Sequence, residues 1–121
     1  MEKIVGLDIC FIIPGRKKEF LYLRKHWDFF YRLAEYSAQP HHRDVTDFYV
    51  DAETLLLIDE DLEHEGAETD IRIDDDFERA CGDGDDSFTN EQQGLRFQRQ
   101  VVHRLLSVVE KHGPVICEWS A

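Results

Sequence analysis

Residues 73–88, IDDDFERACGDGDDSF, contain the densest group of side chains in this chain that could do chemistry, with six aspartates and one glutamate. Carboxylate oxygens bind Ca²⁺, and an EF-hand loop also requires Gly at its sixth position. A loop that begins at Asp74 has Arg79 at that position. A loop that begins at Asp83 has Phe88 there. Neither frame fits, so the sequence predicts no EF-hand and no bound metal.

Histidines and aspartates also lie close together in residues 41–47, HHRDVTD. Imidazole and carboxylate groups are zinc ligands, but adjacent histidines in a loop point in different directions. The three cysteines, Cys10, Cys81 and Cys117, show no C-x-x-C spacing that would indicate a zinc site. A metal-binding protein or small enzyme that uses the clusters at 41–47 or 74–86 is therefore the alternative function and not the favoured one.

Motifs for covalent catalysis and for phosphate binding are absent from the sequence. There is no G-x-S-x-G element. Gly82 and Gly84, the nearest approach to a glycine-rich loop, lie among aspartates that would repel a phosphate. Carboxylates are so numerous that no particular pair of them indicates acid–base chemistry. We therefore expect a protein that is not an enzyme and needs no cofactor.

The charge of the chain is concentrated in its middle third. The formal net charge is −12, and residues 51–91 alone contain 17 Asp and Glu against two Arg. The flanking segments, 1–50 and 92–121, are slightly positive. Such a field attracts basic proteins and repels nucleic acid and anionic membranes, because their phosphates must be neutralised by Lys and Arg. We therefore expect a basic protein partner, and neither nucleic acid nor a membrane.

Apolar residues interrupt the acidic block, including Ile71, Ile73 and Phe77. They should tie the block to a core, so that its carboxylates are displayed on an ordered surface. Like charges held close together destabilise a folded protein, and a basic partner that docks on them offsets this cost. The sequence thus favours a non-catalytic inhibitor of the immunity or antitoxin type, which docks on a basic protein such as a toxin, for example a nuclease. The carboxylates expected to contact this partner are Asp59, Glu60, Asp61, Glu63, Asp74, Asp75, Asp76, Asp83, Asp85 and Asp86.

Runs of apolar and β-branched residues predict four short strands. They fall at residues 3–13, 44–50, 69–75 and 114–120. The first and the last have a similar composition, and each adjoins a long helical pattern. We therefore expect these two strands to be neighbours in one sheet.

Apolar residues at helical spacing predict two long helices, at about residues 16–38 and 89–112. In the first, Trp27 lies on the leading apolar face, so we expect its side chain in the core. In the second, Thr89 is the expected N-cap.

The segment between the long helices is less regular. Residues 51–66 favour a helix that begins after Asp51 and ends at Gly66, although residues 55–58 could instead form a strand. Residues 76–88 are expected to form a loop, because they contain two glycines and many aspartates.

Together these elements predict an α+β fold. We expect a single small domain over residues 1–121, with a mixed sheet of about three to five strands and the two long helices packed on it. The apolar run at 9–13 is too short for a signal peptide or a membrane span, which favours a soluble, cytoplasmic protein. The many aromatic residues of 16–38 leave a further alternative, a structural or adaptor subunit that self-associates through this helix.

Overall fold

Four strands form one sheet in the computed structural model, which describes residues 6–16, 18–37, 47–69 and 72–120. The strands are β1 (Asp8–Ile12), β2 (Glu19–Arg24), β3 (Asp47–Val50) and β4 (Val115–Ser120). Their order across the sheet is β2-β1-β4-β3, and all three neighbouring pairs are antiparallel. The predicted α+β fold and the pairing of the first and last strands are confirmed, but the sheet is antiparallel throughout and not mixed.

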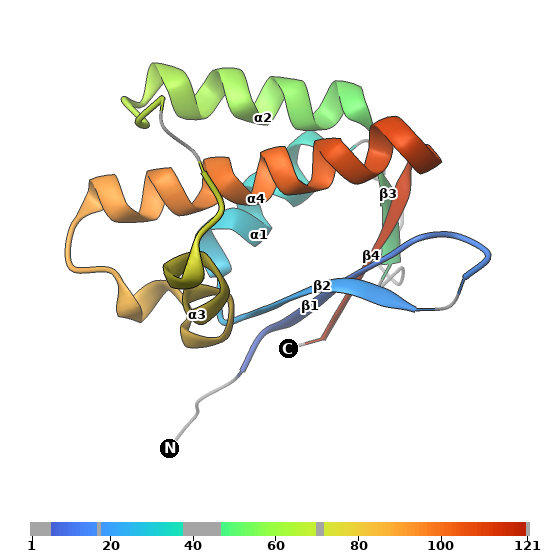
Figure 1. Ribbon diagram of the computed structural model, residues 1–121, viewed down its shortest axis with the longest axis horizontal. Helices are drawn as coiled ribbons and strands as arrows, with labels where there is room; N and C mark the ends of the chain where they lie inside the picture. The colour runs from blue at the N-terminus through green and yellow to red at the C-terminus, as the bar shows by residue number, and fades with distance from the viewer. Residues whose placement is uncertain (1–5, 17, 38–46, 70–71, 121) are drawn as a thin grey trace.

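The helices lie on one side of this sheet (Figure 1). They are α1 (Trp27–Tyr36), α2 (Ala52–His64), α3 (Asp75–Asp83) and α4 (Glu91–His112), with a short 3₁₀ turn η1 (Asp85–Ser87) before α4. The long helix α4 contacts α2, α3 and β4, and α3 also contacts the edge strand β2. The sheet therefore has one face toward the helices and one face that points away from them.

The hydrophobic core lies between the sheet and the helices. Alternate residues of the strands point into it, as the two-residue period of a strand requires. The largest fully buried apolar side chains are Leu7, Ile9, Phe11, Leu23, Phe29, Leu33, Leu55, Ile58, Leu62 and Leu105. Burying one such side chain stabilises the fold by roughly 1.5–3 kcal/mol, so this layer is what holds the helices in place.

The helix predicted at 16–38 is wrong in its first half. Residues 19–24 form β2, which pairs with β1 through a tight connection at Pro14 and Gly15. Within β2 the side chains alternate, so that Leu21 and Leu23 are buried. These two leucines and their neighbours fit both a helical and a strand pattern. The hairpin decides between the two, because it places β2 directly beside β1.

A second correction concerns the acidic segment. The strand predicted at 69–75 is absent from its described part, and the loop predicted at 76–88 is largely helical, since α3 spans Asp75–Asp83. The side chain of Asp74 caps this helix by accepting a 3.0 Å hydrogen bond from the backbone N–H of Phe77. Carboxylates in a first helical turn are also stabilised by the helix dipole. A run of aspartates thus starts a helix here.

Caps also fix the ends of the other helices. Asp51 caps α2 as predicted, accepting a 2.9 Å hydrogen bond from the N–H of Thr54. The helix predicted at 89–112 is confirmed, but its N-cap is Asn90 and not Thr89. The Asn90 side chain accepts a 3.0 Å hydrogen bond from the N–H of Gln93. The helix ends at Gly113, whose φ of +83° favours glycine.

Replacement by alanine should destabilise the fold more at Phe29 than at Trp27. Phe29 is fully buried, whereas Trp27, which we expected in the core, is only half-buried against it. We expect Phe29→Ala to lower the free energy of unfolding by about 3–5 kcal/mol and Trp27→Ala by roughly half as much. Urea unfolding of the two variants measures the difference. Equal losses would contradict this view of the α1 face.

Candidate functional site

The acidic run of α2 is largely paired inside the molecule. Arg99 of α4 is 7% exposed, and its Nε donates to Asp59 Oδ1 at 2.9 Å. Its Nη2 donates to Glu63 Oε2 at 3.0 Å, and Nε2 of His103 lies 3.1 Å from Asp59 Oδ1. Two of the four carboxylates predicted on this helix therefore surround an arginine that is nearly buried.

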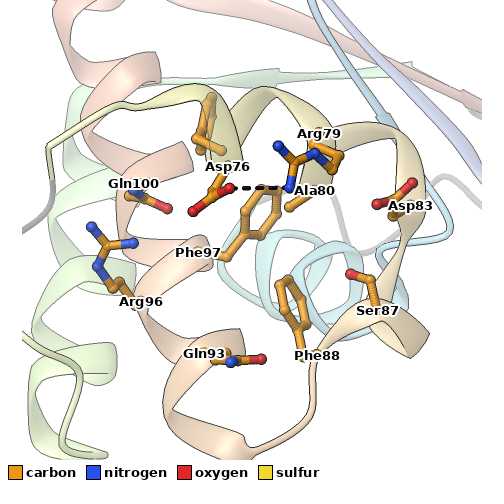
Figure 2. Close-up of a pocket in the computed structure, with 11 residues that line it drawn as sticks. Asp76, Arg79, Ala80, Asp83, Ser87, Phe88, Gln93, Arg96, Phe97 and Gln100 are labelled. Carbon is orange, nitrogen blue, oxygen red and sulfur yellow. Dashed lines mark ion pairs between the residues drawn. The ribbon is translucent and has the colours of Figure 1, made fainter.

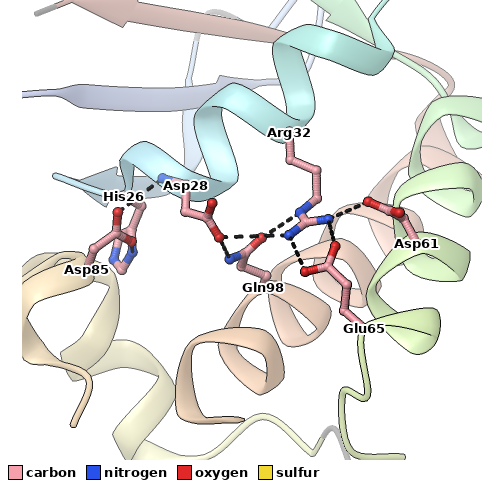
Figure 3. Close-up of polar contacts among 7 residues, drawn as sticks. All are labelled: His26, Asp28, Arg32, Asp61, Glu65, Asp85 and Gln98. Carbon is pink, nitrogen blue, oxygen red and sulfur yellow. Dashed lines mark hydrogen bonds and ion pairs between the residues drawn. The ribbon is translucent and has the colours of Figure 1, made fainter. Parts of the chain in front are cut away.

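A second arginine forms an ion pair with another carboxylate of α2. The Arg32 guanidinium, from α1, bonds to Asp61 and to Glu65, and its Nε donates to Gln98 Oε1 at 3.0 Å (Figure 3). The Gln98 amide in turn donates to Asp28. The bond from Arg32 holds the pKa of Glu65 below its usual value. Of the predicted α2 carboxylates, Glu60 and Glu63 are exposed, and Glu63 is paired with Arg99.

Asp85, in the acidic segment, also has a structural role. The α1 N-cap, His26, makes no side-chain capping bond. Asp85 Oδ2 supplies it instead, accepting a 3.0 Å hydrogen bond from the N–H of Asp28 (Figure 3). Its other oxygen lies 3.4 Å from Nδ1 of the fully buried His26, whose Nε2 donates to the carbonyl of Ala80 at 2.6 Å. Asp85 thus joins the end of α3 to the start of α1.

The backbone before Asp85 comes unusually close to β2. Gly84 has φ +85°, and a Cβ at this position would lie 2.7 Å from Cβ of Lys25. The N–H of Asp85 donates to the carbonyl of Lys25 at 3.0 Å. Lys25 itself has a positive φ of 59°. Only glycine allows this approach, and the contact fixes how α3 lies against the edge of the sheet.

The outer face of α3 carries the predicted carboxylates that remain exposed. Asp75, Asp76 and Asp83 are exposed, as is Glu78, which the sequence analysis did not select. Asp76 lies 3.2 Å from the exposed Arg79, a surface pair of the kind that contributes little to stability. Asp74 is the helix cap, and the side chain of Asp86 lies outside the described part of the chain.

A cleft opens beside this face, between α3 and the first half of α4 (Figure 2). Its volume is about 340 Å³. Phe77, Phe88 and Phe97 line its floor, with ring centroids 5.3–5.4 Å from Phe97 to the other two. Its rim is polar and carries both charges, from Asp76, Asp83, Arg79 and Arg96. The sequence analysis missed this cleft, because its aromatic residues come from three separate elements.

The chemistry that these groups could perform is limited. Within the described ranges, no three His, Cys, Asp or Glu side chains are arranged to hold a metal ion. Most of the 41–47 cluster lies outside those ranges. Burial, with nearby carboxylates, raises the pKa of the Cys10 thiol to about 12 and that of Cys81 to about 11, and burial raises that of Cys117 as well. Protonated thiols are poor nucleophiles and poor ligands at neutral pH.

No family model, curated protein or solved structure matches this chain. Among the described residues, no helix is both long enough and apolar enough to cross a membrane. The geometry of the acidic surfaces is therefore the basis for assigning a function.

Loss of the buried arginine should be costly. Arg99→Ala leaves Asp59 and Glu63 close together without their cation, and we expect the free energy of unfolding to fall by about 3–5 kcal/mol. Arg104→Ala is the matched control, because Arg104 is exposed on the same helix and its loss should change stability by no more than about 0.5 kcal/mol. Denaturant unfolding measures the free energy of unfolding of both variants. Similar losses in the two would show that the ion pairs of Arg99 stabilise the fold no more than an exposed arginine does.

Acid should weaken the contact between Arg32 and Glu65. The pKa of Glu65 is lowered in the folded protein, so its stabilising contribution is present above the unfolded value of about 4.3 and is lost as the pH falls through the folded pKa. The difference in unfolding free energy between wild type and Glu65→Gln should therefore be largest near neutral pH and shrink below about pH 4.3. A difference that stays constant down to pH 3 would contradict this.

Proposed function

We propose that this protein is a non-catalytic binding protein that docks on a basic protein, as an inhibitor of the immunity or antitoxin type. One observation carries the proposal. The α3 helix presents Asp75, Glu78 and Asp83 to solvent, and none of them is paired with a described cation. The carboxylates of α2, in contrast, are mostly paired within the molecule. The α3 face is therefore where the excess negative charge is available to a partner.

The cleft beside α3 supplies the other half of such an interface. Its rim has as many arginines as aspartates, so it suits an uncharged anchor such as an aromatic side chain of the partner. Hot spots of protein interfaces are commonly aromatic anchors seated in pockets, with charged pairs around them. Lys and Arg of the partner would surround the anchor and meet the exposed carboxylates of α3. The negative field would also raise the association rate.

The cytoplasmic location belongs to this proposal. The three cysteines of the described chain are free, which is typical of a reducing compartment. The self-association alternative is less favoured, because α1 is much shorter than the predicted helix and buries Phe29, Phe30 and Leu33 in the core. One exposed aromatic side chain, Tyr31, does lie on α1, whereas the other two among the described residues, Tyr22 and Tyr49, lie on strands.

Partner capture followed by kinetics tests the proposal. The partner is captured from lysate of the source cell, identified and purified, and its association rate is measured at low and high salt. We expect the triple variant Asp75→Asn, Glu78→Gln, Asp83→Asn to associate about tenfold more slowly at low salt, with the difference reduced at high salt. The fold should be intact, because all three side chains are exposed.

The matched control removes the same charge elsewhere. Glu35, Glu53 and Glu110 are exposed on α1, α2 and α4, so their replacement by Gln also removes three negative charges. This control should slow association far less than the α3 variant. If the two variants associate equally, or if the captured partner is acidic, the α3 face is not the docking site. If the partner's activity is unchanged in the complex, the inhibitor role is wrong even where binding is real.

A further inference from the structure

His26 is a buried histidine at the place where α1, α3 and η1 meet. Its side chain is fully buried, and Nδ1 has no hydrogen-bond partner among the described residues. The other ring nitrogen, Nε2, lies 2.6 Å from the carbonyl oxygen of Ala80 on α3. Most buried polar atoms have a partner, because a buried polar atom without a hydrogen bond is destabilising. The state of Nδ1 therefore requires a chemical explanation.

The contact with Ala80 fixes where the hydrogen of a neutral ring must lie. A carbonyl oxygen only accepts hydrogen bonds, so Nε2 of His26 must carry a hydrogen and donate it. A neutral imidazole has a hydrogen on one nitrogen only, so its Nδ1 has a bare lone pair. That lone pair lies 3.4 Å from Oδ1 of Asp85, which also has only lone pairs to offer (Figure 3). The neutral ring therefore places two acceptors against each other in a buried position.

A proton on Nδ1 removes this conflict. An imidazolium donates from both nitrogens, so Nδ1 then directs an N–H toward Asp85 while Nε2 keeps its bond to Ala80. A hydrogen bond between two charged groups is stronger than one between neutral groups. The 3.4 Å separation is within ion-pair distance, and only a small movement of Asp85 brings it to the length of a hydrogen bond, about 2.7–3.2 Å. The ring and the carboxylate together therefore form a place for one additional proton.

The other ionisable groups on the surrounding elements have different surroundings from this pair. On the segment of the histidine itself, Lys25 is partly exposed, and Asp28 accepts a hydrogen bond from Gln98. On α4, Arg96 forms ion pairs with Glu68 and Asp74. The thiol of Cys81 on α3 keeps its proton at neutral pH, because burial raises its pKa to about 11. The remaining charged side chains of α3 are exposed, and they are Asp75, Asp76, Glu78, Arg79 and Asp83.

The His26 ring also lies directly beneath the cleft beside α3. It stacks on Phe97, with 4.4 Å between the ring centroids and 19° between the planes, and its centroid is 6.0 Å from that of Phe88. Both phenylalanines line the cleft, and so does Ala80 (Figure 2). A positive ring is also attracted to the face of an aromatic ring. A change in the charge of His26 therefore acts on the floor of the cleft and on the end of α3 at the same time.

We propose that His26 and Asp85 form a proton-binding site that regulates the α3 docking face. A proton on Nδ1 holds the end of α3 against the start of α1, and its loss as the pH rises releases this contact. The effect on docking rests on the function proposed above, whereas the proton site rests on the geometry of this chain alone. A cleft that is already held in its docking shape binds more tightly, so docking is favoured at the lower pH.

The direction of the pH effect follows from the proton balance. The ion pair exists only in the folded protein, so the folded protein binds the proton more tightly than the unfolded chain does. The stabilisation from this site is therefore fully present below about pH 6.5, where an ordinary histidine is charged in the unfolded chain too, and it is lost as the pH rises above that value.

Two-bond ¹H–¹⁵N NMR spectra of the protein alone test the proton site. The two nitrogens of an imidazolium resonate at similar frequencies, whereas those of a neutral ring are well separated. We expect the His26 ring to change from imidazolium to the neutral Nε2–H form between about pH 6 and about pH 9. The backbone amide signals of Ala80, Asp85 and Phe88 should change over the same range, because loss of the ion pair releases the end of α3.

Three results of this titration would contradict the proposal. The ring could stay neutral, with its hydrogen on Nε2, down to about pH 5. It could titrate without any response from the three amide signals, which would show that the proton does not affect α3. It could remain charged at about pH 9, and the pair would then be a permanent ion pair and not a switch.

Two variants remove the two halves of the site. In Asp85→Asn the charge is lost, but the side-chain oxygen can still accept the hydrogen bond from the N–H of Asp28. We expect its His26 ring to lose the proton at a pH lower by about 1 unit or more, because the neighbouring negative charge is gone. In His26→Gln the amide can still donate to Ala80 but binds no proton, so the amide signals of α3 should lose their pH response. If this variant fails to fold, Asp85→Asn still tests the site.

His103→Gln is the matched control. His103 also lies beside a carboxylate, with Nε2 3.1 Å from Oδ1 of Asp59, but it joins α2 and α4 and not α3. Its replacement should leave the pH response of the Ala80 and Asp85 amides unchanged. If it removes this response as His26→Gln does, the response is a general effect of pH on the fold and not the action of the His26 site.

The consequence for docking is measured with the basic partner identified in the capture experiment above. Raising the pH from about 6 to about 8.5 should weaken the binding of wild type about fivefold more than that of His26→Gln, because the variant has no proton to lose at this site. Equal weakening of the two would show that the site does not regulate docking. If no basic partner is captured, the docking function fails, and the titration of the protein alone still decides whether the proton site exists.

Discussion

The position of the acidic helix α2 depends on two arginines that are nearly withdrawn from solvent. The side chain of Arg32 is 11% exposed and that of Arg99 is 9% exposed, and each bonds to two carboxylates of the α2 region. Arg32 comes from α1 and Arg99 from α4, so they connect α2 to two other helices. Without them the apolar face of α2 could reach the core only by bringing unpaired carboxylates with it, and buried unpaired charge is strongly destabilising.

This pairing divides the acidic block into two parts. The carboxylates of α2 serve the fold, whereas those of α3 are held outward by a separate set of contacts. Asp74 caps α3, and Gly84 lets the chain pass against Lys25 at its other end. Both contacts are local or backbone-based, so they leave Asp75, Glu78 and Asp83 on the outer face of α3 without a described cation. The same composition thus produces an internal framework in one helix and a display surface in the next.

Sequence patterns predicted the elements whose signals are local. The Asp51 cap, the long apolar stripe of α4 and its end at Gly113 can all be predicted from the sequence, because each depends on residues a few positions apart. The sequence wrongly predicts that the helix of residues 16–38 includes residues 19–24. These residues form the strand β2 because they pair with β1. The run of aspartates predicts a loop, although Asp74 is in fact the cap of a helix. Nor could the sequence show that Arg99 would be buried, since its partners Asp59 and Glu63 lie on a different helix.

The arrangement of several other carboxylates could not be predicted for the same reason. Those on the sheet face occur singly in the sequence, outside the acidic block, and one of them, Asp8, precedes an apolar run. Only the strand register joins Asp47 to Glu118 and Tyr22 to Cys10. Net charge is therefore a poor guide to where a partner would bind this chain. What decides it is which carboxylates lack a described cation, and Asp75, Glu78 and Asp83 of α3 meet this condition, whereas most carboxylates of α2 are paired with Arg32 or Arg99.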